Sequence, residues 1–111
     1  LMGVCGGSRG RIHQDIGRKL VDLTDFIKPD LTVIDAYRVL LRNGPTGGDL
    51  ADVEELKTLI VSHDPTLADT YACRLMRVPL EEVSYVRVAH DRSFGLMDLA
   101  AADILDLRRS A

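Results

Sequence analysis

The sequence lacks the features that mark several specialised classes of protein. It has only two cysteines, Cys5 and Cys73, which are too few for a disulfide scaffold and lack metal-ligand spacing. They are interpreted as free thiols of a cytoplasmic chain. The 14 basic residues do not exceed the 17 acidic ones, which argues against a nucleic-acid partner. No apolar run reaches the roughly 18 residues of a membrane span, and no signal peptide is evident.

What is present is ordinary soluble composition. The chain has 111 residues, 46% of them hydrophobic and 28% charged, with a net charge of −3. This length predicts one α/β domain over residues 1–111. Because the chain starts at Leu1 on a glycine-rich stretch, we expect it to be the carboxy-terminal part of a longer protein.

Apolar spacing predicts the elements of the first half. Residues 12–28 carry apolar side chains at intervals of 4, 4, 3 and 4, the stripe of a helix that Pro29 then stops. Residues 31–34 and 56–62 are apolar and β-branched, which predicts two buried strands with Asp35 at the carboxyl end of the first. Residues 37–41 fit either a strand or a helical turn.

The second half predicts two helices and a strand. Asp64 and Pro65 are a typical helix start, and the apolar face of that helix is expected to consist of Leu67, Ala68, Tyr71, Ala72, Leu75 and Met76. The stretch after Pro79 fits both the alternation of a strand and the spacing of a helix. Glu81 and Glu82 near its start favour a helix. "DILDLRR", residues 103–109, predicts a last strand. The alternation of predicted strands and helices indicates a small, mainly parallel sheet with flanking helices, as a fragment of a larger α/β domain.

The stretch "RNGPTGGD", residues 42–49, is the main candidate site. About 20 residues separate Asp35 from Leu56, and loops of that length are often functional. Glycines permit positive φ and expose backbone N–H groups, which can form an anion-binding nest. The ligand-binding candidates here are Asn43, Gly44, Thr46, Gly47 and Gly48. A plain connecting loop remains the alternative, because neither a P-loop nor a dinucleotide fingerprint is present.

Four further residues are candidates. Asp35 and His63 are expected catalytic residues, since each follows a predicted strand and can titrate or accept protons. Arg11 and His13 precede a helix amino terminus, where anions bind, and are candidate ligand contacts. No set of residues has metal-ligand spacing. The favoured alternative for His63 is a surface turn residue, and for Arg11 and His13 it is a helix entry with ordinary surface charges.

Several stretches together resemble a known family. "LMGV", "GRIHQ", "LTVIDA", "NGPTGGD" and "DPTLADTYACRLM" occur in this order, and they resemble the carboxy-terminal half of domain-of-unknown-function family 362 of bacteria and archaea. The positions that match its pattern are His13, Asp35, Asn43, Gly44, Pro45, Gly47, Gly48, Asp64 and Asp69. Cys5 departs from the pattern.

The resemblance implies redox work, because members often accompany ferredoxin-like iron–sulfur modules. This chain lacks the cysteine motifs of such modules, so no cofactor is expected in it and any iron–sulfur cluster would lie elsewhere in the full-length protein. The favoured function is ligand or anion binding at residues 43–48. The rival is a non-enzymatic interaction domain that docks an iron–sulfur partner. Apolar strands with too few covering helices also predict a homodimer.

Overall fold

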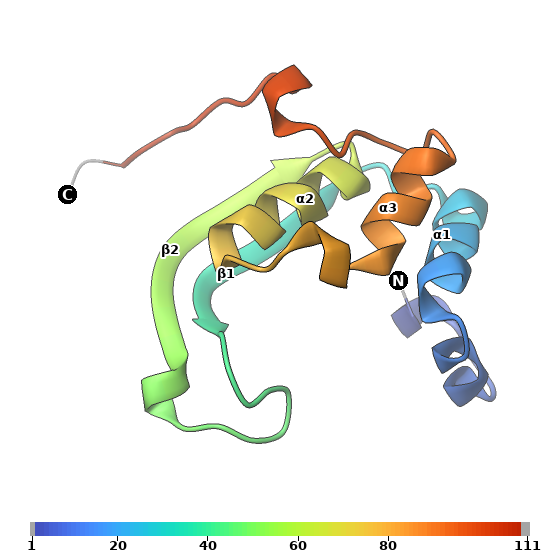
Figure 1. The fold of residues 1–111 in the computed structure, drawn as a ribbon, viewed down its shortest axis with the longest axis horizontal. Helices are drawn as coiled ribbons and strands as arrows, with labels where there is room; N and C mark the ends of the chain where they lie inside the picture. The colour runs from blue at the N-terminus through green and yellow to red at the C-terminus, as the bar shows by residue number, and fades with distance from the viewer. Residues whose placement is uncertain (1, 110–111) are drawn as a thin grey trace.

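The computed structural model describes residues 2–109 (Figure 1). Within that range the chain forms three α-helices and two strands, joined by short 3-10 turns. In chain order these are α1 (Ile16–Ile27), β1 (Thr32–Leu40), β2 (Val53–Ser62), α2 (Pro65–Met76) and α3 (Ser84–Asp91). In this part of the chain, no helix has the length and apolar character needed to cross a membrane.

The prediction of a mainly parallel sheet is wrong. In the described residues β1 and β2 form a two-stranded antiparallel sheet, with Thr32 opposite Ser62 and Leu40 opposite Val53. Parallel strands need a crossover, usually a helix, and residues 41–52 contain only one 3-10 turn. The chain therefore returns directly as a hairpin. Both strands extend beyond their predicted bounds, so the irregular connection is shorter than expected and Asp35 lies inside β1.

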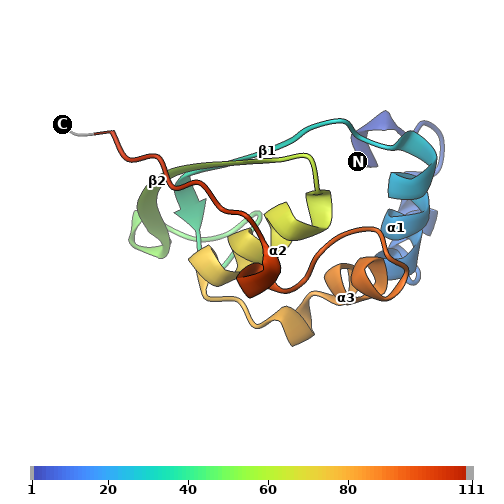
Figure 2. The same ribbon diagram turned by 90° about the horizontal axis from the view of Figure 1, so that it is seen from above.

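The elements form three layers. The β1–β2 ribbon packs on one side of α2, and α3 with α1 lies on the other (Figure 2). A small core joins the ribbon to α2: Ile60, Ala68 and Ala72 are buried, with Ile34 and Tyr71 packed against them. The opposite side of α2 is also buried, at Thr66, Thr70 and Cys73. α2 is therefore a central helix covered on two sides.

Local chemistry explains where α2 begins. Asp64 Oδ1 accepts the Leu67 N–H at 2.9 Å, and Pro65 occupies the first turn. This confirms the predicted start. The other carboxylate oxygen accepts the Leu96 N–H at 2.8 Å, so the same residue also ties the segment after α3 to this end of α2.

The helix after Pro79 is confirmed, and its packing explains a glycine in α1. Residues 84–91 form α3, whose Val86 is fully buried. A Cβ on Gly17 would lie 2.6 Å from Ser84 Oγ and 3.4 Å from the Tyr85 nitrogen. Glycine thus allows α1 and α3 to approach closely, which offsets its low helix propensity.

The strands were predicted to be buried, but among the described residues only one side of them is covered. Between residues 32 and 36, side chains alternate between the α2 side and solvent. The uncovered side of the ribbon carries large apolar side chains, which we call the open face: Leu31, Val33, Tyr37, Leu59 and Val61. In Figure 2, α2 lies below the ribbon and no element covers the upper side.

The predicted last strand is also wrong. Residues 103–109 have no regular secondary structure, although they lie beside β2 and line a groove of about 860 Å³ with it and α2. Strand formation depends on cross-strand partners more than on local preference. Here Arg108 donates instead to the nearby Asp106 carboxylate.

Candidate functional site

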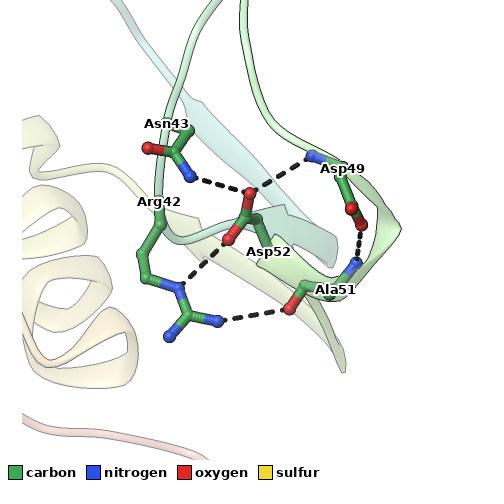
Figure 3. Close-up of polar contacts among 5 residues, drawn as sticks. All are labelled: Arg42, Asn43, Asp49, Ala51 and Asp52. Atoms are coloured by element: carbon green, nitrogen blue, oxygen red, sulfur yellow. Dashed lines mark hydrogen bonds and ion pairs between the residues drawn. The ribbon is translucent and has the colours of Figure 1, made fainter.

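The glycine-rich loop is organised around Asp52 (Figure 3). One oxygen of this carboxylate accepts from Arg42 Nε at 3.2 Å. The other accepts from Asn43 Nδ2 at 2.9 Å and from the Asp49 N–H at 3.2 Å. The Arg42 guanidinium also donates to the Ala51 carbonyl at 3.2 Å. The two ends of the hairpin connection are thereby held together.

Two glycines are explained by this geometry. Gly48 has φ of +99°, which glycine adopts without strain. A Cβ on Gly47 would lie 2.9 Å from the Asn43 carbonyl oxygen, which accepts the Gly47 N–H. The predicted freedom of positive φ is thus used at Gly48, whereas glycine at position 47 permits a close backbone approach. Asn43 also has a positive φ, of +59°.

Three donors of the hairpin connection already have an anionic partner within the chain. Asp52 takes the Asn43 amide and the Asp49 N–H, and the Asp49 carboxylate takes the Ala51 N–H at 2.6 Å. An incoming anion would have to approach two carboxylates, which repel it. Anion binding by Gly44, Thr46 and the other loop residues stays a prediction, and this arrangement opposes it.

Acid should open this loop. Hydrogen bonding from Asn43 is the main cause that lowers the pKa of Asp52 below its ordinary 3.8. Because the pKa is lower in the folded chain, the stabilisation is complete above about pH 3.8 and is lost as pH falls through the folded-state value. We expect the NMR resonance of the Asp49 amide to keep its closed-loop position above about pH 3.8. It should move toward its open-loop position only as the pH falls below that value.

The Asp52→Asn variant should show the open-loop resonance already at neutral pH. Asp98 provides a matched control, because its carboxylate accepts the Ala100 N–H in a similar 3-10 turn. Asp98→Asn should leave the loop resonances unchanged. A neutral-pH spectrum of Asp52→Asn with an unshifted Asp49 amide would contradict the assigned role of Asp52.

The two predicted catalytic residues do not meet. Asp35 lies opposite Leu59, four positions along β2 from His63, or about 13 Å at roughly 3.3 Å per residue. Asp35 Oδ1 accepts the Tyr37 N–H at 2.9 Å, beside the register shift between Ala36 and Arg38. His63 Nδ1 donates to the Asp30 carbonyl at 2.8 Å. Both side chains have local structural contacts.

The remaining predicted residues lie elsewhere. Arg11 and His13 are exposed in the 3-10 turn Arg9–His13, which packs against α1. The Arg11 carbonyl accepts from Lys19 Nζ at 2.7 Å. Figure 1 shows this turn apart from the hairpin loop. The structure thus brings Asn43 together with the glycines of the loop, and separates that group from Asp35, His63 and the Arg11–His13 turn.

Sequence reasoning missed a group of polar residues between the helices. Asp69 lies outside the predicted apolar face of its helix, yet it is half-buried and lines a cavity of about 260 Å³ between α1, α2 and α3. Burial raises the pKa of its carboxyl. Burial, with the neighbouring Asp69 charge, raises the pKa of Tyr85 to about 12. The signal in the sequence was the polar run of Thr66, Asp69, Thr70 and Cys73 on the second face of α2.

The described residues contain no group of three or more His, Cys, Asp or Glu side chains placed to hold a metal ion. Cys73 is buried in α2, and Cys5 lies near the start of the chain. Burial raises the pKa of the Cys73 thiol, which keeps it protonated and unreactive at neutral pH.

Comparison with known proteins gives one match. A family described as "Domain of unknown function (DUF362)" matches residues 1–74. That range runs from the first residue through α1, the ribbon and most of α2. Neither the curated proteins nor the solved structures give a match.

Proposed function

The chain belongs to the DUF362 family, a domain of unknown function, and from that premise we propose that it is a non-enzymatic interaction domain. It docks a protein partner on the open face of the β1–β2 ribbon. The family resemblance adds an iron–sulfur protein or module as the expected partner. Ligand binding at residues 43–48 is the less favoured function, since the Asp52 carboxylate already accepts the Asn43 side-chain amide and the Asp49 N–H.

The exposure of the open face carries this proposal. Val33 and Val61 pair across the two strands and are 57% and 60% exposed, and Leu59 is 67% exposed. Isolated apolar side chains on a surface are ordinary, but a contiguous group on one side of a sheet is typical of a binding surface. Leu31 and Tyr37 extend the same face at 52% and 51% exposed.

One charge on the open face specifies the partner further. Asp35 is exposed and lies opposite Leu59, among these apolar side chains. A partner that buries this region must satisfy the carboxylate, because an unpaired buried charge is costly. We therefore expect the partner to present an apolar surface with a Lys or Arg side chain opposite Asp35.

The spacing of the predicted catalytic residues supports a role without catalysis. A general base and its partner must come within hydrogen-bonding reach of one substrate. Asp35, His63 and the loop residues occupy separate positions along the ribbon. The hairpin connection is also fixed by Asp52, so it provides a rigid support for the ribbon.

Titration of the chain with a purified [4Fe–4S] ferredoxin tests the proposal. We expect backbone amide shifts confined to β1 and β2, and we expect Leu59→Lys to abolish them. Leu50→Lys is the matched control, since Leu50 is 89% exposed but lies in the hairpin connection outside the open face. Absence of shifts up to about 1 mM ferredoxin would exclude this partner. Shifts at residues 43–48 would instead support the loop as the contact.

A further inference from the structure

We infer that the cavity between α1, α2 and α3 binds a small organic cation bearing an ammonium or amidinium group. The cavity holds about 260 Å³. At roughly 30 Å³ for each water volume, that is room for a ligand of about eight non-hydrogen atoms. This site lies on the opposite side of α2 from the open face and is independent of the proposed docking function.

Asp69 is the one charged residue of the lining, and the other lining residues are neutral. Asp69 contributes the carboxylate and Tyr85 a phenol oxygen. The remaining lining residues come from α1, α2, α3 and the segment after α3, and include Val21, Thr24, Thr66, Ala89 and Phe94. No Lys, Arg or His side chain belongs to this lining.

The hydroxyl hydrogens of the two threonines are already used. Thr24 Oγ1 donates to the Leu20 carbonyl at 2.8 Å, and Thr66 Oγ1 donates to the Phe94 carbonyl at 3.4 Å. Their oxygens can therefore only accept further bonds. A ligand that supplies N–H donors and a positive charge matches such a lining, whereas an anion would meet acceptors and the Asp69 carboxylate.

The nearest arginine of the segment after α3 does not neutralise Asp69. The Arg92 guanidinium lies 5.2 Å from the centre of the Phe94 ring, and its Nη1 pairs with Asp22 at 2.6 Å. No Lys, Arg or His side chain among residues 2–109 forms an ion pair with the half-buried Asp69 carboxylate. Its desolvation is costly, and a bound cation would relieve that cost. The aromatic ring of Tyr85, which also lines the cavity, attracts cations in addition.

Benzylammonium is a suitable probe, and neutral benzyl alcohol has the same number of non-hydrogen atoms. We expect benzylammonium to cause saturable NMR shifts of the amides of Val21, Asp69 and Ala89, with benzyl alcohol binding at least about tenfold more weakly. Equal affinity of the two compounds would overturn the inference. So would the absence of saturable shifts below about 10 mM benzylammonium.

Two variants locate the charge. Asp69→Asn should weaken benzylammonium binding about tenfold or more and leave benzyl alcohol unchanged. It should also raise the melting temperature, since it removes a desolvated charge. Asp91→Asn, an exposed carboxylate on α3, is the matched control and should bind like the unaltered chain. Unchanged affinity in Asp69→Asn would overturn the inference.

Tyr85→Phe keeps the ring and removes the phenol oxygen, so it provides a second readout if Asp69→Asn fails to fold. We expect its benzylammonium affinity to fall about threefold to tenfold, the loss of one hydrogen bond. This variant should still bind benzylammonium more tightly than benzyl alcohol, because Asp69 remains. Loss of that discrimination in Tyr85→Phe would assign the selectivity to the phenol and contradict the role given to Asp69.

Discussion

Replacing Gly95 with alanine should destabilise the fold by about 3 kcal/mol. Gly95 has φ of +157°, and an added Cβ would clash with Asp64 Oδ1 and lie 2.7 Å from Thr66 Cβ. Both neighbours belong to the start of α2, where Asp64 holds the Leu67 and Leu96 N–H groups. The added methyl group therefore disturbs the helix start and the chain segment tied to it. Urea unfolding followed by circular dichroism measures the change.

The control for this substitution is Gly10→Ala. An added Cβ at Gly10 meets no atom within 4 Å, so its effect should stay within about 0.5 kcal/mol. Asp64→Ala alone should cost about 1–3 kcal/mol through the lost cap and the unpaired N–H groups. The double variant should be less destabilised than the sum, because Asp64 is part of the clash. If the effects of Gly95→Ala and Asp64→Ala simply add, the clash with Asp64 is not the cause of the destabilisation.

The unaltered chain should self-associate, and Leu59→Lys should make it monomeric. Both faces of a two-stranded ribbon need cover, and in the described residues only one side is packed. Without another partner, a second copy is the simplest cover for the open face. Each substitution occurs twice in a two-fold dimer, so we expect the dimer dissociation constant to rise at least about a hundredfold. Light scattering at micromolar concentration gives the mass.

The free energy of unfolding of the monomer should change little in Leu59→Lys, since Leu59 is already 67% exposed. Leu50→Lys should remain associated, because Leu50 is outside the open face. If the unaltered chain scatters as a monomer throughout this concentration range, the open face does not self-associate. Ferredoxin titration then remains the test of the docking proposal.

Sequence reasoning succeeded where the signal is local. Asp64 and Pro65 specify the start of α2 through contacts within three residues, and the apolar stripe of α2 reaches the buried Ala68 and Ala72. It failed where the outcome depends on distant contacts. The direction of the sheet is decided by how residues 41–52 close. Asp35 lies within β1 because Arg38, Val39 and Leu40 pair with β2.

The candidate site shows the same division. The unusual loop at residues 43–48 was identified from composition alone, but its organiser, Asp52, lies outside the glycine-rich stretch and contacts Asn43 nine residues away. Asp69 is outside the apolar stripe predicted for α2, so that pattern did not predict its burial. A helix covered on two sides does not follow the single-stripe rule, and only the packing of α3 shows that this second face is buried.

The central position of α2 makes it the spacer of the molecule. Its buried side chains are all small, Ala68 and Ala72 toward the ribbon and Thr66, Thr70 and Cys73 toward the other helices. The distances from α2 to the ribbon and to the other helices are therefore set by how closely the backbones approach, rather than by large interlocking side chains. A longer side chain at Ala68 would push the ribbon away, and one at Thr70 would push α3. The spacing between α2 and the ribbon and the spacing between α2 and α3 can thus be increased independently, each by a single substitution.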